Sequence, residues 1–170
     1  MLRSLPLGYY LALLLALGVA NYTIYRSVLT PPRTTVSVFS AGKGTVALVR
    51  DPSGRTLLID TGSDASILRD LGTALPYWQR SLDAVVLSSD KVAQTGGLPI
   101  LQERYRVARL FSAGTETFPY GAPLMFSSDA FLTVAAPGIF FVHYGANVFA
   151  LSSSTTPGSY ASNGTAFIKR

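Results

Sequence analysis

Carboxylates follow two apolar segments of the sequence, and the carboxyl ends of strands are where α/β folds place their catalytic and binding residues. Asp60 ends one apolar run, and Asp90 follows another after two serines. Together with Asp64 they could form an oxygen-rich site for a hard divalent cation in an atypical hydrolase. His143 is the single histidine and lies in the apolar stretch FFVHYG, so no imidazole is expected to help them. The sequence therefore favours structural capping roles for these carboxylates, with the hydrolase as the alternative.

Two other motifs fail on their spacing. The segment SAGKGT, residues 40–45, has glycine where the magnesium-binding hydroxyl of a phosphate loop would follow the lysine. It is typical of a tight turn between strands. Ser88 and Ser89 follow an apolar run, but no G-x-S-x-G elbow surrounds either one, which argues against a serine hydrolase.

The charge of the chain is modestly positive. It has 170 residues, 14 Lys and Arg against nine Asp and Glu, a net charge of +5 and no cysteine. These values allow one domain and an anionic partner, and they exclude disulfides and thiolate metal sites. The one local basic cluster, at Arg104, Arg106 and Arg109, is typical of a solvated face, with DNA contact as the functional alternative.

The amino-terminal segment contains no charged residue from Ser4 to Tyr25. Its length is close to the roughly 20 apolar residues of a membrane-spanning helix, so we expect a transmembrane helix or signal anchor over residues 1–29. A cleaved signal peptide, with its cut near Ala20, and a buried core helix are the alternatives. Paired prolines then predict a linker over residues 30–35, before a folded domain over residues 36–170.

The folded part begins with strands and continues with alternating helices and strands. This order predicts a mixed sheet with helices on its faces, an α/β (α+β) layered domain. The remaining residues predict further strands, a hairpin closed by residues 144–147 and a flexible polar loop over residues 152–162. The expected strands are 36–39, 45–50, 56–60, 83–88, 107–111, 131–135, 140–144, 148–152 and 165–168, and the expected helices are 64–75 and 98–105.

The same elements carry a family resemblance. The segment VSVFSAGKGTVALVRDPSGRTLLIDTGS, ending in LIDTG at residues 58–62, resembles the start of the metallo-β-lactamase-like domain of ComEC-type competence proteins. The following residues to about 111 are also similar to that family, which likewise has an upstream membrane helix. The resemblance implies an αββα sandwich. This chain is short for four layers, so we expect a truncated version.

The metal motif of that family is degenerate in this chain. In the family a strand is followed by H-x-(H or D)-x-D-H and then G-G-L, and these residues hold two divalent ions, usually zinc or manganese. Registering Gly96 and Gly97 on the G-G-L places serine, lysine, alanine and glutamine at the four ligand positions. These side chains are unsuited to hold zinc. The degenerate positions are Ser89, Lys91, Ala93 and Gln94, and the retained family residues are Asp60, Gly62, Gly96 and Gly97.

The resemblance and the degenerate motif together imply a function. We expect no metal cofactor and no catalytic residues, hence a pseudoenzyme that serves as a binding or assembly module in DNA uptake. Its expected location is the membrane, with the folded domain on the extracytoplasmic side, and its expected partners are DNA and a multi-helix channel, because one helix cannot form a channel alone. An envelope interaction protein unrelated to DNA is the remaining alternative.

Overall fold

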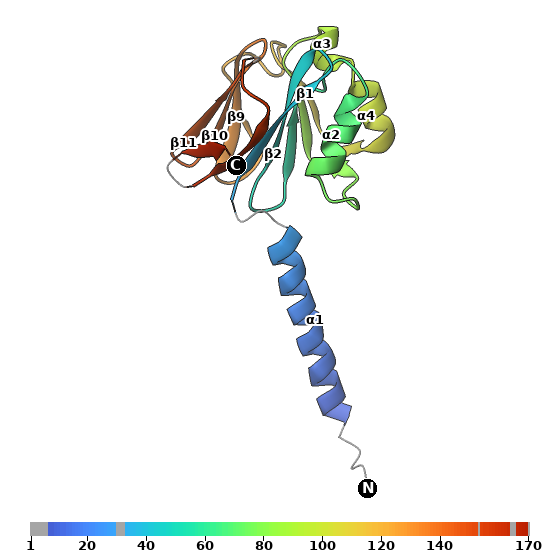
Figure 1. The fold of residues 1–170 in the computed structure, drawn as a ribbon. Coiled ribbons are helices and arrows are strands. Elements are labelled where there is room, and N and C mark those ends of the chain that lie inside the picture. The colour runs from blue at the N-terminus through green and yellow to red at the C-terminus, as the bar shows by residue number, and fades with distance from the viewer. Residues whose placement is uncertain (1–6, 30–32, 153, 164–165, 170) are drawn as a thin grey trace.

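The computed structural model describes residues 7–29, 33–152, 154–163 and 166–169, and within the first helix it describes the side chains of residues 8–24. The chain forms a long helix joined to a layered α/β domain (Figure 1). Mixed α/β architecture was predicted from the order of elements, and it is confirmed.

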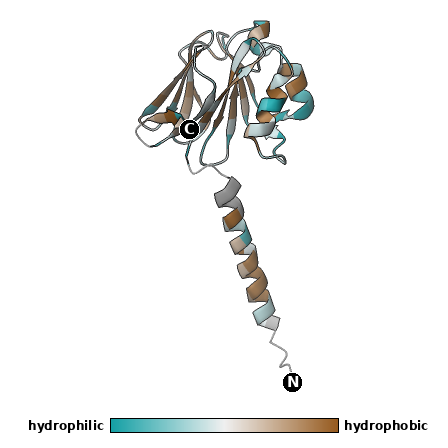
Figure 2. Cartoon of the chain, in the orientation of Figure 1, coloured by the Kyte–Doolittle hydropathy of each residue, from teal (hydrophilic) through white to brown (hydrophobic). Residues whose placement is uncertain are grey.

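Helix α1 (Leu7–Leu29) extends away from the domain. Its described side chains, residues 8–24, are all exposed and uncharged, and most of them are apolar (Figure 2). Within the described residues, however, no helix combines the length and apolar character needed to cross a membrane. The helix expected over residues 1–29 is therefore present, whereas the membrane span expected there is not found. The predicted linker, residues 30–35, lies partly outside the described residues.

A seven-stranded mixed sheet forms the centre of the domain. Its first three strands are an antiparallel meander, and the crossover strands that follow run parallel to the third. At the other edge the two C-terminal strands pair with each other, and the inner one of them pairs with the first strand. The order across the sheet is β13 (Phe167–Lys169), β12 (Gly158–Ser162), β1 (Thr35–Ala41), β2 (Gly44–Arg50), β3 (Thr56–Ile59), β5 (Ala84–Leu87) and β7 (Leu110–Ser112).

Smaller elements cover both faces of this sheet. Helices α2 and α4 pack on one face, where Leu48, Leu58 and Ile67 belong to one buried core. A four-stranded antiparallel sheet packs on the other, where Val49, Leu132 and Phe140 belong to a second core. The covering elements are α2 (Ser66–Ala74), α3 (Val92–Thr95), α4 (Leu98–Arg104), the strand pair β4 (Ser81–Leu82) and β6 (Arg106–Val107), and the sheet β11 (Asn147–Leu151), β10 (Ile139–Tyr144), β9 (Ala130–Ala136) and β8 (Pro123–Met125).

The described elements therefore form three layers: helices, the large sheet and the small sheet (Figure 1). Alternation of buried and less buried residues along β9 and β11 matches a sheet with one face in the core. Among the described residues no helix covers the outer face of the small sheet. This arrangement is a mixed α/β fold and does not identify a family.

Most predicted elements are confirmed to within a few residues, and the exceptions lie in weakly patterned segments. The polar loop expected over residues 152–162 is wrong for its last five residues, because these form β12, which lies between β13 and β1 near one edge of the large sheet. Pairing with β1 satisfies backbone groups of a segment whose own residues carry little strand signal. The strand expected over residues 107–111 is divided between β6 and β7. Strand β8 was not predicted.

Candidate functional site

Asp60 lies immediately after β3 and is locked to the neighbouring strand. Its side chain is buried at 2% exposure, and its backbone is left-handed with φ of 58°. The Ser88 backbone N–H donates to one carboxylate oxygen at 2.7 Å, and the Ser88 hydroxyl donates to the other at 2.8 Å. Aspartate is one of the few residues that enter the left-handed region readily. Asp60 thus joins the carboxyl ends of parallel strands β3 and β5.

Burial dominates the acid–base behaviour of this carboxyl group. Removal from water raises the pKa of Asp60 to about 7, although the two hydrogen bonds from Ser88 act in the opposite direction. The group is therefore neutral in weakly acidic solution and titrates near neutral pH.

Glycines let three loops around Asp60 pack backbone against backbone. A Cβ atom on Gly44 would clash with the carbonyl oxygen of Ala93, and one on Gly97 would clash with that of Thr61. Gly62 has φ of 73°, which favours glycine, and its carbonyl oxygen accepts the Gly97 N–H at 3.0 Å. The glycines retained from the family pattern therefore have a structural explanation in this chain.

The four degenerate positions lie on the loop and short helix α3 that follow β5. The Ser89 hydroxyl donates to Oε1 of Gln94 at 3.3 Å, and the Gln94 carbonyl oxygen accepts the N–H and the hydroxyl of Thr61, both at 2.8 Å. Lys91 is exposed and Ala93 is half-buried. The segment is held to the β3–α2 loop mainly by main-chain groups.

A small polar cavity of about 130 Å³ lies beside Asp60. Lys43 lines it from the β1–β2 turn, Thr45 from β2 and Gln94 from α3, and Ser152 lines it from the residue that follows β11. This volume corresponds to a few water molecules and lies below the roughly 300 Å³ at which pockets for drug-sized ligands begin. The cavity can hold water or a small ion, but not a nucleotide.

The side chains here do not fit a pair of divalent ions. Both oxygens of Asp60 already accept hydrogen bonds, Lys43 adds an ammonium group to the same cavity, and the amide of Gln94 is a poor zinc ligand. Asp64 and Asp90, the other carboxylates of the hydrolase hypothesis, are exposed. Nowhere in the part of the chain that the structure describes do three His, Cys, Asp or Glu residues gather as a metal site.

The remaining predicted site residues lie elsewhere. Arg104 ends α4, Arg106 begins β6 and Arg109 precedes β7, and all three are exposed. His143 stacks on Phe131 of the adjacent strand, with ring centroids 4.2 Å apart. Its position in a strand agrees with the structural role expected for it.

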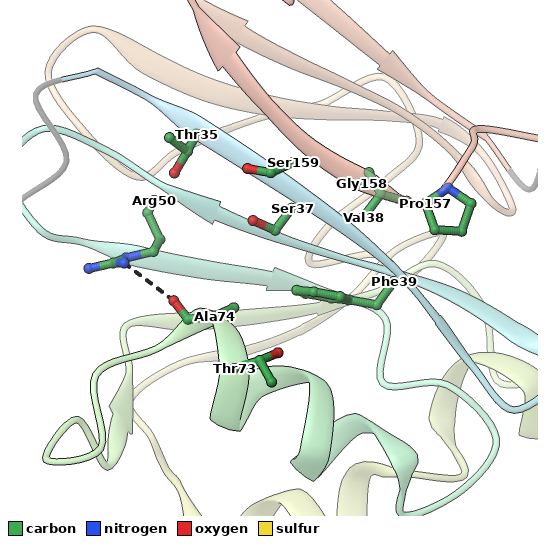
Figure 3. Close-up of a pocket in the computed structure, with 10 residues that line it drawn as sticks. All are labelled: Thr35, Ser37, Val38, Phe39, Arg50, Thr73, Ala74, Pro157, Gly158 and Ser159. Atoms are coloured by element: carbon green, nitrogen blue, oxygen red, sulfur yellow. Dashed lines mark hydrogen bonds between the residues drawn. The ribbon is translucent and has the colours of Figure 1, made fainter. Parts of the chain in front are cut away.

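Sequence reasoning missed the partner of Asp60 and a larger cavity. Ser88 was considered only as a nucleophile, although its place at the end of a parallel neighbour of β3 was the available signal. A cavity of about 680 Å³ lies between β1, β12 and the end of α2, far from any predicted site residue (Figure 3). It is lined mainly by hydroxyl and apolar groups, with Arg50 at one side. No sequence pattern marks this cavity, because its walls come from distant segments.

Comparisons with known proteins identify no family. No family model and no curated protein matches the chain. A solved structure described as "Peroxy diiron species of chemotaxis sensor ODP" is similar over 68% of this chain, with 13% identity and a TM-score of 0.44. The match covers 55% of that structure's chain, so this chain spans about half its length. A likeness at this level carries no argument about function.

Proposed function

We propose that the protein is a membrane-associated, non-catalytic domain related to the metallo-β-lactamase-like part of ComEC proteins, acting as an assembly module in DNA uptake. The observation that carries the non-catalytic part is the pair of hydrogen bonds from Ser88 to both oxygens of Asp60. The one acidic residue retained at the motif is thereby used as a structural bridge. The four neighbouring motif positions offer a hydroxyl, an ammonium, a methyl and an amide group.

Helix α1 supports the membrane part of the proposal. Its described side chains, from residue 8 to residue 24, include leucines and tyrosines that are each more than half exposed. An exposed apolar surface that extends along a helix from residue 8 to residue 24 is typical of a site for lipid or for another protein. We propose that this helix associates with the membrane because residues 8–24 carry no charged side chain to favour water, even though no described helix is long and apolar enough to cross a bilayer.

The assembly role follows from the same helix and from the sequence resemblance. A DNA channel requires many membrane helices, which one helix cannot supply. We therefore propose that a separate multi-helix protein is the partner, and that this domain helps to assemble or position it.

The experiment compares the full chain, purified in detergent, with its Asp60→Asn variant. We expect no stoichiometric zinc or manganese by elemental analysis and no manganese-dependent nuclease or phosphodiesterase activity in either protein. Bound metal, or hydrolysis that the substitution abolishes, would establish the hydrolase instead. Cells that lack the chain should take up less labelled DNA, and unchanged uptake would remove the DNA part of the proposal.

A further inference from the structure

The end of the domain opposite Asp60 carries exposed aromatic and basic side chains together. Tyr77 and Trp78 are 80% and 47% exposed, and their rings meet edge to face with centroids 4.7 Å apart. Exposed Arg80 follows in the same loop, and exposed Arg104 and Arg106 lie on α4 and β6. We call this surface the basic–aromatic rim, and it consists of Tyr77, Trp78, Arg80, Arg104 and Arg106.

The fold itself brings these five side chains together. The Arg106 N–H donates to the carbonyl oxygen of Arg80 at 2.8 Å, where β4 and β6 pair. The Arg80 guanidinium lies 5.9 Å from the ring centroid of Tyr105. A hollow of about 200 Å³ is lined by Tyr77, Arg80 and Arg104 among others. The rim therefore combines the α2–β4 loop, which carries Tyr77, Trp78 and Arg80, with the end of α4 and the start of β6.

The rim and helix α1 lie at the same end of the domain. Thr35, the first residue of β1 after the α1 connection, pairs with Arg50 at the end of β2. The Arg50 guanidinium donates to the carbonyl oxygen of Ala74 at 3.4 Å, which fixes the last residue of α2 at that end (Figure 3). Tyr77 follows three residues later. Figure 1 shows α1 leaving the domain at the end where α2 terminates.

The charges at this end are mainly positive. Four exposed arginines, at positions 80, 104, 106 and 109, stand against the exposed acids Asp83 and Glu103, and Asp51, which follows Arg50, is buried. One Asp83 oxygen accepts the backbone N–H of Thr56 at 2.7 Å, so part of its charge is committed within the fold. The excess of guanidinium groups is thus directed to solvent, beside two aromatic rings.

From these observations we propose that the basic–aromatic rim docks on the anionic headgroups of the membrane that holds α1. Arginine pairs with lipid phosphates, whereas Tyr and Trp favour the layer between headgroups and acyl chains. Each basic side chain near an anionic bilayer contributes about fivefold to binding. Stacking on single-stranded DNA would use the same residue types but gives no reason for them to lie at the α1 end, whereas a lipid surface does. The inference rests on the membrane part of the proposed function.

Trp78 supplies the test because it is the only tryptophan in the chain. The full chain is reconstituted into phosphatidylcholine vesicles with or without phosphatidylglycerol. We expect the Trp78 emission to shift to the blue and to be quenched by brominated lipid only when phosphatidylglycerol is present, and high salt to reverse both effects. In the double variant Arg80→Gln and Arg104→Gln, the docking equilibrium should weaken about thirtyfold.

The matched control removes two cations elsewhere, through Arg69→Gln and Lys169→Gln. It lowers the net charge equally and should retain the emission shift. Unchanged emission on anionic vesicles, an equal loss in both double variants, or a shift produced by oligothymidylate instead of lipid would overturn the inference. Flotation with pure phosphatidylcholine vesicles separates the two proposals. A chain that does not float would contradict membrane association through α1 and rim docking together. A chain that floats, but whose Trp78 emission does not shift on anionic vesicles, would contradict rim docking alone.

Discussion

The two ends of the large sheet differ in how they use polar residues. At the Asp60 end, glycine loops pack backbone on backbone. Asp60 accepts hydrogen bonds from Ser88 there, and it lines a cavity of about 130 Å³. At the other end, polar and aromatic side chains such as Arg104 and Tyr77 point to solvent. The family resemblance concerns residues at the Asp60 end, whereas the exposed aromatic and basic side chains that a partner could contact lie at the other end.

The comparison teaches that resemblance to a motif and possession of its activity are separate matters. Gly62 and Gly97 are required wherever these loops touch, whether or not a metal lies nearby. Asp60 can likewise serve either of two roles, since it can bridge two strands without binding a metal. In this chain the packing of the fold is sufficient to explain the residues that match the motif.

The largest loss of stability is expected from a substitution that disrupts the close backbone contact between loops at the Asp60 end. Gly44→Ala places a methyl group against the Ala93 carbonyl oxygen, which backbone atoms cannot easily avoid. We expect a loss of about 3 kcal/mol or more in the free energy of unfolding, measured by urea denaturation. Gly72→Ala is the control, because its added methyl group meets nothing within 4 Å in α2, and it should raise stability by about 0.5–1 kcal/mol. Equal effects of the two substitutions would refute the packing argument.

The next effect concerns the bridge between Asp60 and Ser88. Asp60→Ala leaves the buried Ser88 N–H and hydroxyl without their partner and puts alanine in the left-handed region. We expect a loss of about 2–4 kcal/mol. Asp60→Asn keeps an acceptor for the N–H and tolerates the backbone, so it should cost less than about 1 kcal/mol at pH 5. If asparagine proves as damaging as alanine, the hydrogen-bond account is wrong.

A pH dependence of stability follows from the raised pKa of Asp60. The folded state holds this proton up to about pH 7, whereas the unfolded chain releases it near the ordinary value of 3.8. Stability from this group is therefore complete below about pH 4 and declines as pH rises to about 7, with a slope of at most about 1.4 kcal/mol per unit. Asp60→Asn should remove this slope in unfolding measurements across the range. An unchanged slope in the variant would assign it to another group.

The smallest effect on folding is expected at the basic–aromatic rim. Trp78→Ala and Arg106→Gln alter exposed side chains, so each should change the unfolding free energy by about 0.5 kcal/mol or less. A large loss in either variant would mean that the rim is a structural element, in contrast to the docking surface proposed for it.

Sequence patterns predicted most of the fold because each core strand is marked by residues within or next to it. Apolar runs and glycine turns marked β1, β2, β3 and β5 to within about two residues. Strand β12 was missed because serines and a tyrosine become strand residues only through pairing with β1. The bridge from Asp60 to Ser88 and the gathering of Tyr77 with Arg104 join residues at least 27 positions apart, and no local pattern encodes such contacts.

The most direct test of the account is thermal unfolding of the full chain and of Asp60→Asn, with and without added zinc or manganese. An ion bound by the folded protein would raise the midpoint in proportion to its affinity and concentration. Because Asp60 is a hydrogen-bonded bridge in our account, we predict that neither ion raises the midpoint of either protein. A midpoint that zinc or manganese raises in the native chain, and leaves unchanged in the variant, would show Asp60 to be a metal ligand and would contradict the account.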